Sequence, residues 1–210
     1  WDLTSIRRTL TRSRAVLGYS LPDFHNPTGA LLDESGREEL AAVFDRVGAW
    51  LVVDETFADL ALDGHNPVEP TARHGAGRVI SIGGTSKVFW GGLRVGWARL
   101  PRDPVLVDRV VRARHNLDLG TPVLEQLVAA HLLDESDTLV PRRVKTLCEQ
   151  RAAPVDALRT RLPEWSFGQP SGGVNLWVTL PMARSTVLAA AAPHPGLHPP
   201  AGGRMAAAGG

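Results

Sequence analysis

The fold is decided by residues 85–97, which read Thr-Ser-Lys-Val-Phe-Trp-Gly-Gly-Leu-Arg-Val-Gly-Trp. The apolar residues 79–82 precede this stretch and are typical of a buried strand, while residues 94–100 predict a further strand after the glycines. Lys87 therefore follows a strand end, in a turn rich in glycine and serine. A lone lysine at such a place is more often a surface group, so the neighbouring segments must decide whether its amine acts as a nucleophile.

Two earlier apolar segments, residues 15–21 and 50–54, also predict buried strands. Between them, apolar residues recur at helical spacing. Strands that alternate with helices indicate an α/β fold with a mostly parallel sheet sandwiched by helices. Such sheets bind ligands at the carboxyl ends of their strands, which is where Asn26, Asp54 and Lys87 are expected.

Four polar side chains near these strand ends match what pyridoxal 5'-phosphate requires of a protein. Lys87 can react with the cofactor aldehyde, and Asp54, at the end of an apolar strand, can face the pyridine nitrogen. Asn26 can donate to the ring oxygen, and Arg94 can clamp the phosphate together with the amides of the glycine turn. Each residue alone also has a common structural explanation. Lys87 could be a surface lysine, Asp54 a loop cap, Asn26 a turn residue and Arg94 a salt-bridge partner.

Three blocks of the sequence resemble the class I/II aminotransferases, whose fold is the fold-type I pyridoxal-phosphate transferase fold. They are residues 22–29, 53–56 and 85–97, in this order. Residues 120–126 and 172–177 are most similar to the aminotransferase-like domain of MocR-type transcriptional regulators of the GntR family. The resemblance covers roughly residues 17–180.

The resemblance implies a role for each site residue. Lys87 would form the Schiff base with pyridoxal 5'-phosphate and would be the catalytic residue. Asp54 would bond the pyridine nitrogen, Asn26 the ring oxygen, and Arg94 the phosphate. Ser86, beside Lys87, would also belong to the cofactor site.

Two departures from the family pattern concern Phe57 and Gly84. Phe57 belongs to the cofactor site but stands where many relatives have a tyrosine that bonds the ring oxygen. Gly84 stands where a serine often reaches the phosphate. A phenyl ring packs but cannot donate a hydrogen bond, so we expect catalysis to be weakened more than cofactor binding.

We expect the chain to be the effector-sensing domain of a MocR/GntR-type regulator that binds pyridoxal phosphate and an amino acid or amine ligand. The first alternative is an amino-acid aminotransferase, in which Lys87 would also move the α-proton. The second is a truncated, inactive remnant. The resemblance implies a homodimer, and DNA would be contacted only through a module absent from this chain.

The sequence pattern divides the chain into three parts. Residues 1–138 are expected to form the cofactor-binding large domain, incomplete at its N-terminus. Residues 139–188 are expected to form an interdomain helix, bent or interrupted at Pro154, and part of a small α/β domain with a strand over residues 174–180. Residues 189–210, rich in Ala, Gly and Pro, are expected to form a disordered tail.

Composition excludes several other classes of protein. The 23 basic and 22 acidic residues give a net charge of +1, so no overall charge favours nucleic acid or a membrane surface. A single cysteine, Cys148, excludes an internal disulfide, and the seven histidines show no metal-ligand spacing. No apolar stretch is long enough to span a bilayer and no signal peptide is evident, so a cytoplasmic protein is expected. The start at Trp1 suggests a piece of a longer protein.

Overall fold

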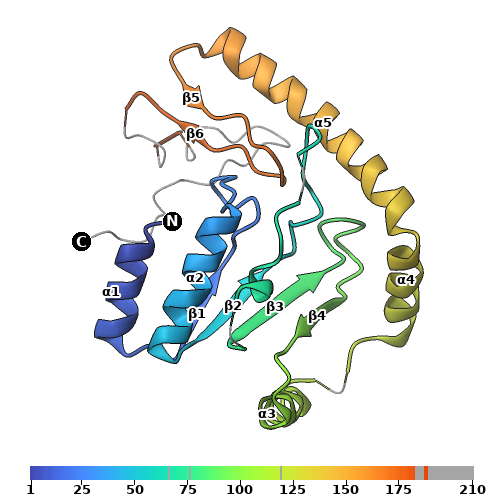
Figure 1. Cartoon of the computed structure of the whole chain (residues 1–210). Helices are drawn as coiled ribbons and strands as arrows, with labels where there is room; N and C mark the ends of the chain where they lie inside the picture. Colours follow the sequence, from blue (N-terminus) through green and yellow to red (C-terminus); the bar gives the residue numbers. More distant parts are fainter. Residues whose placement is uncertain (66, 76, 119, 183–186, 189–210) are drawn as a thin grey trace.

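The main element of the chain is a four-stranded sheet with the order β1-β2-β3-β4 (Figure 1). The computed structural model describes residues 1–65, 67–75, 77–118, 120–182 and 187–188. Strands β1 to β3 run parallel, whereas β4 is antiparallel to β3. The carboxyl ends of the first three strands and the start of β4 therefore lie at the same edge. The strands are β1 (Leu17–Ser20), β2 (Trp50–Asp54), β3 (Val79–Gly84) and β4 (Gly96–Arg99).

Helix α2 (Glu34–Val47) provides the main packing against the sheet. The Asp33 carboxylate accepts the Gly36 amide and caps its first turn, and Gly48 ends it with a φ of 71°, a conformation that favours glycine. Apolar side chains along one stripe of the helix are buried against the sheet. This core includes Leu40, Val43, Phe44, Leu51 and Val53.

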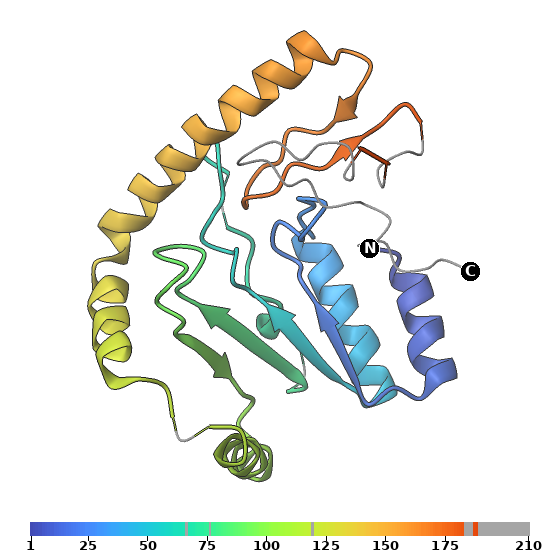
Figure 2. The same cartoon turned by 180° about the vertical axis from the view of Figure 1, so that it is seen from behind.

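The two faces of the sheet differ. Leu51 and Val53 of β2 are fully buried, and the intervening Val52 and Asp54 point to the other face because side chains alternate along a strand. Helices α1 (Leu3–Ser13) and α2 lie together on the face that Leu51 and Val53 share, and Figure 2 shows the sheet from its other face. The predicted α/β class with a mostly parallel sheet is confirmed.

The chain continues through a short 3₁₀ helix and three further helices. Helix α5 is continuous through Pro141 and Pro154, so the predicted interruption at Pro154 is wrong, whereas the alternative of a bend there stays a prediction. Each proline removes one backbone donor and crowds the carbonyl four residues earlier, but the helix continues while Leu147 and Val155 are buried on its inner side. The elements are η1 (Thr71–Arg73), α3 (Pro104–His115), α4 (Val123–Asp134) and α5 (Ser136–Arg161).

The segment after α5 forms a small two-stranded antiparallel sheet from β5 (Ser166–Phe167) and β6 (Val178–Thr179). The strand predicted over residues 174–180 is thus limited to two residues. Backbone bonds join the segment to the loop after β2, from Leu62 to Ser171 at 2.8 Å and from Gly173 to Leu60 at 2.9 Å. The predicted tail, residues 189–210, lies outside the described residues, and the predicted domain boundaries stay predictions.

Candidate functional site

Asp54 is held at the end of β2 by donors on both of its carboxylate oxygens. The Thr56 backbone amide and hydroxyl donate to Oδ1 at 3.0 and 2.6 Å. The Tyr19 hydroxyl, from the neighbouring strand, donates to Oδ2. The strand register makes this contact possible, because Tyr19 pairs with Val52 and so lies on the same face of the sheet as Asp54.

The hydroxyl of Tyr19 keeps its proton over the whole physiological pH range. Partial burial, the hydrogen bond to Asp54 and the negative charge of that carboxylate together raise the pKa of Tyr19 to about 12. At neutral pH, Tyr19 is therefore a neutral donor facing a carboxylate. The sequence reasoning missed this residue, although strand alternation in residues 17–20 could have placed it beside Asp54.

Lys87 lies in the turn after β3, exposed and next to a buried ring. Its Nζ is 5.5 Å from the centre of the Phe57 ring, which is 3% exposed. The turn is closed at both ends, because the Thr85 amide and hydroxyl both donate to the Val95 carbonyl at 3.0 Å. The Phe89 amide adds a helix-like bond to the Thr85 carbonyl at 2.9 Å. The backbone of the turn thus fixes the base of the Lys87 side chain.

Asn26 lies in a tight loop that follows β1. The Gly29 amide donates to the His25 carbonyl at 2.6 Å, and the His25 amide donates to the Ala30 carbonyl at 2.7 Å. Gly29 has a φ of 71°, which a side chain would strain. The loop presents Asn26 at the surface. Its amide group is therefore accessible to a ligand at this edge of the sheet.

Arg94 and Ser86 complete the set of predicted residues at this edge. Arg94 is exposed and precedes the start of β4 by two residues. Because β4 is antiparallel to β3, its start lies beside the end of β3, near Lys87 in the chain fold. Ser86 is half-buried beside Lys87. The topology thus brings the predicted residues to one edge, while their individual roles toward a cofactor stay predictions.

A buried ion pair connects the loop that contains Asn26 to helix α2. Nη2 of Arg37 on α2 is 2.6 Å from Oδ1 of Asp23, and the two side chains are 1% and 3% exposed. The Arg37 Nε also donates to the Leu32 carbonyl at 3.0 Å. Because Asp23 lies three residues before Asn26, this pair connects the loop to α2.

Glu55 follows Asp54 directly and has a different environment. Burial raises the pKa of the Glu55 carboxyl, and a hydrogen bond from the Ser81 hydroxyl at 3.1 Å offsets part of this effect. Asp54 and Glu55 are thus both half-buried, but Asp54 is bonded by Thr56 and Tyr19 whereas Glu55 is bonded by Ser81.

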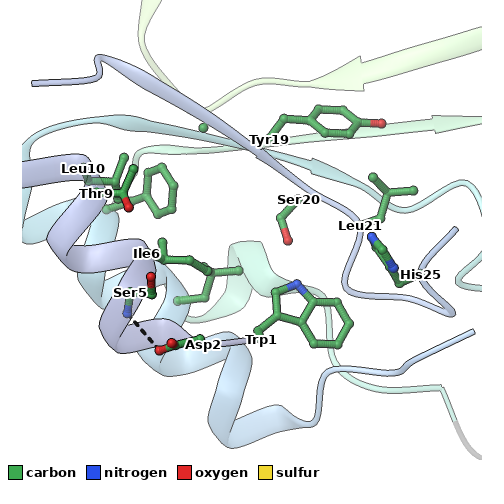
Figure 3. A pocket seen from close by; sticks show the side chains of 13 residues that line it. Trp1, Asp2, Ser5, Ile6, Thr9, Leu10, Tyr19, Ser20, Leu21 and His25 are labelled. Atoms are coloured by element: carbon green, nitrogen blue, oxygen red, sulfur yellow. Dashed lines mark hydrogen bonds between the residues drawn. The ribbon is translucent and has the colours of Figure 1, made fainter. Parts of the chain in front are cut away.

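A pocket of about 570 Å³ lies between α1 and β1 (Figure 3). Figure 3 shows Tyr19 and Ser20 on opposite sides of β1, with Ser20 toward Trp1. The rings of Trp1 and His25, which both line this pocket, meet edge-on with their centres 5.8 Å apart. Asn26, Asp54, Lys87 and Arg94 do not line it. Tyr19, which bonds Asp54, does line it, so β1 separates the pocket from the four predicted cofactor residues and Tyr19 belongs to both.

Two further observations concern metals and membranes. Within the part of the chain that the structure describes, no three histidine, cysteine, aspartate or glutamate side chains gather in an arrangement that could bind a metal ion. Among the described helices, none combines the length and apolar character needed to cross a membrane.

Comparison with known proteins identifies relatives of two kinds. A family model described as aminotransferase class I and II matches residues 13–197. The 2-aminoadipate transaminase of Thermus thermophilus is 32% identical over 189 residues, which cover 88% of this chain and 47% of that protein. The uncharacterised HTH-type transcriptional regulator YdfD of Bacillus subtilis is 33% identical over 174 residues, or 80% of this chain and 35% of that protein. The chain thus spans half or less of the length of these relatives.

Solved structures show the same architecture. LysN, an α-aminoadipate aminotransferase from Thermus thermophilus, was crystallised in complex with N-(5'-phosphopyridoxyl)-L-leucine. It matches 89% of this chain and 50% of its own, with a TM-score of 0.77 and 29% identity. Pyrococcus horikoshii kynurenine aminotransferase, in complex with PMP, matches 86% of this chain and 45% of its own, with a TM-score of 0.76 and 30% identity.

Proposed function

The chain belongs to the aminotransferase class I and II family, and from this premise we propose that it binds pyridoxal 5'-phosphate through Lys87. One observation carries the proposal. The sheet topology brings the carboxyl ends of β1, β2 and β3 and the start of β4 to one edge. Asn26 and Lys87 follow β1 and β3 in the sequence, Asp54 is the last residue of β2, and Arg94 precedes β4.

The side chains present fit the chemistry of this cofactor. Thr56 occupies Oδ1 of Asp54, while Oδ2 accepts one bond from Tyr19 and retains a lone pair for a protonated ring nitrogen. The exposed Asn26 offers an amide donor for the ring oxygen. The guanidinium of Arg94 and the amides of the preceding glycines offer donors for the phosphate.

Lys87 supplies the amine that attaches to the cofactor aldehyde. Bound pyridoxal phosphate provides an aldehyde that exchanges amines and a ring that withdraws electrons from them. Phe57 covers the Lys87 amine from one side with an apolar ring. The phenyl ring of Phe57 cannot donate a hydrogen bond, so Asn26 would be the donor to the oxygen on the cofactor ring and position 57 would add none.

We further propose that this domain binds an amino acid or amine and reports its presence as the sensing part of a transcriptional regulator. Similarity to regulators such as YdfD supports this role, as does the loss of the donor at Phe57. Ligand binding can act on a distant module only if it favours one conformation over another. The second candidate is an amino-acid aminotransferase, which the similarity to the 2-aminoadipate transaminase supports.

We also propose that the protein acts as a homodimer. Helices α3 and α4 expose apolar side chains that would be shielded by association with a second subunit. Sedimentation velocity would reveal a dimer, and a monomer at all concentrations tested would contradict this proposal. The exposed large apolar residues on the two helices are Val105, Val107, Val110, Val111, Val123, Leu124, Leu127, Val128 and Leu133.

The cofactor proposal has a direct chemical test, because the chain contains only two lysines, Lys87 and Lys145. The protein is incubated with pyridoxal phosphate, reduced with borohydride and digested for mass spectrometry. We expect a pyridoxyl group on Lys87 and none on Lys145, which is exposed on α5. Lys87→Ala should lose the label and the visible absorbance, whereas Lys145→Ala should keep both. Label on Lys145 alone, or no label, would overturn the proposal.

Exchange of the α-hydrogen separates sensing from catalysis. Candidate amino acids are incubated with the loaded protein in deuterium oxide, and loss of the α-proton signal is followed by NMR. A sensor should change the absorbance of the bound cofactor without rapid exchange. Turnover of an amino acid to its keto acid would instead establish the enzyme.

A further inference from the structure

One contact at the candidate site joins Tyr19 to Asp54 and has no role yet assigned to it. The two residues are 35 positions apart in the sequence and lie on adjacent strands. The Tyr19 hydroxyl donates to Oδ2, the oxygen that Thr56 does not bond. Three donors therefore act on one carboxylate, two on Oδ1 and one on Oδ2.

This division of donors fixes the orientation of the carboxylate. Thr56 alone would leave Asp54 free to turn about the bond to its carboxyl group, because a carboxylate has two equivalent oxygens and about four acceptor positions. A donor from a second strand removes this freedom. One acceptor position on Oδ2 is taken by Tyr19, and the remaining one points in a defined direction.

We propose that Tyr19 is a positioning residue, whose hydroxyl holds Asp54 so that Oδ2 receives the ring nitrogen of pyridoxal phosphate. This role rests on the proposed function, because it requires that the cofactor binds beside Asp54. Tyr19 itself does not touch the reacting atoms. Its contribution is to set in advance the geometry of a charged hydrogen bond, so that little ordering is needed when the cofactor arrives.

The ionisation behaviour of Tyr19 agrees with this geometry. Its pKa is raised to about 12 by partial burial and by the bond and charge of Asp54. The hydroxyl therefore remains a donor at any pH at which the protein would work. A tyrosinate would repel Asp54 and release it.

The contact can be tested without any cofactor, because Tyr19 is the one tyrosine of the chain. Tyrosinate absorbance then reports this residue alone. At pH 11, about a tenth of the wild-type hydroxyl should be ionised, against about nine tenths for an unperturbed tyrosine. In Asp54→Asn the ionised fraction should at least double, because the carboxylate charge is gone while the burial remains. An unchanged fraction, with circular dichroism showing a folded protein, would overturn the contact.

The positioning role is tested with a pair of ligands. One is pyridoxal phosphate, and the other is its 1-deaza analogue, in which C–H replaces the ring nitrogen. Tyr19→Phe should bind pyridoxal phosphate about tenfold more weakly than wild type, because the freed Asp54 side chain must then be ordered when the cofactor binds. The deaza analogue should bind wild type and Tyr19→Phe equally, since it makes no bond to Asp54.

Three outcomes distinguish the possibilities. If Tyr19→Phe binds both ligands equally more weakly than wild type, Tyr19 has a structural role only. If its affinity for both ligands is unchanged, Tyr19 has no role in binding. Either result overturns the inference. If wild type binds neither ligand at Lys87, the proposed function itself fails, whatever the tyrosinate titration shows. Should Tyr19→Phe not fold, Thr56→Val removes a hydroxyl donor from Oδ1, and the same selective weakening is expected for it.

Discussion

The side-chain nitrogen of Lys87 lies 5.5 Å from the centre of the buried Phe57 ring. The residue at position 57 therefore faces the amine that we propose as the cofactor attachment point. Many family members are expected to have a tyrosine here, and the missing hydroxyl is the main chemical difference at this side of the site.

Restoring the hydroxyl with Phe57→Tyr should strengthen cofactor binding. The new donor would reach the ring oxygen and add one hydrogen bond, which corresponds to a three- to tenfold lower Kd for pyridoxal phosphate at about 1 kcal/mol. Without cofactor the same hydroxyl is buried without a partner, so the free energy of unfolding should fall by about 1 kcal/mol. Absorbance titration and urea denaturation measure the two effects. Weaker cofactor binding in a stably folded Phe57→Tyr would contradict this expectation.

Gly84 offers a second position at which cofactor binding can be improved. A Cβ added there would meet the Val95 carbonyl at 3.4 Å, which is ordinary contact. Gly84→Ser should therefore fold normally and lower the Kd for pyridoxal phosphate severalfold by donating to the phosphate. Gly83→Ser is the matched control, because its Cβ would lie 2.7 Å from the Trp97 ring and on the other face of the strand. It should lose stability and gain no affinity.

The buried ion pair between Arg37 and Asp23 should have a large effect on the free energy of unfolding. Arg37→Ala leaves the Asp23 carboxylate buried without its partner, which costs about 3–5 kcal/mol of unfolding free energy. Urea denaturation measures the loss. Arg73→Ala breaks an exposed pair with Glu69 and should leave the denaturation midpoint unchanged. Similar midpoints for the two variants would show that the buried pair does not support the fold.

Glu55 should make stability depend on pH in a predictable direction. Burial raises the pKa of the folded carboxyl above its ordinary value of 4.5, so the folded state holds this proton more tightly than the unfolded state. The stabilisation is complete below pH 4.5 and is lost as pH rises through the folded pKa. Glu55→Gln cannot ionise, so its unfolding free energy relative to wild type should increase between pH 4.5 and neutral pH. A difference that is the same at every pH would contradict the assignment.

Local sequence predicted much of the sheet and the set of residues at its edge. Apolar segments located the cores of β2 and β3 because both strands are packed from one side by α2 and flanked on both edges. β1 and β4 are shorter than predicted by a few residues at their ends. Apolar character alone does not define where backbone pairing stops. Helix α5 passes through Pro154 because packing of its inner side outweighs one missing bond.

The sequence by itself determined the α/β class and the chain positions of Asn26, Asp54, Lys87 and Arg94, because strand ends and turns are marked by local residue patterns. Only the tertiary structure decided that Tyr19 bonds Asp54, that Arg37 is buried against Asp23, and that Phe57 faces Lys87. These contacts join residues 14 to 35 positions apart. Strand register and helix packing set such distances, and both depend on the whole fold rather than on neighbouring residues.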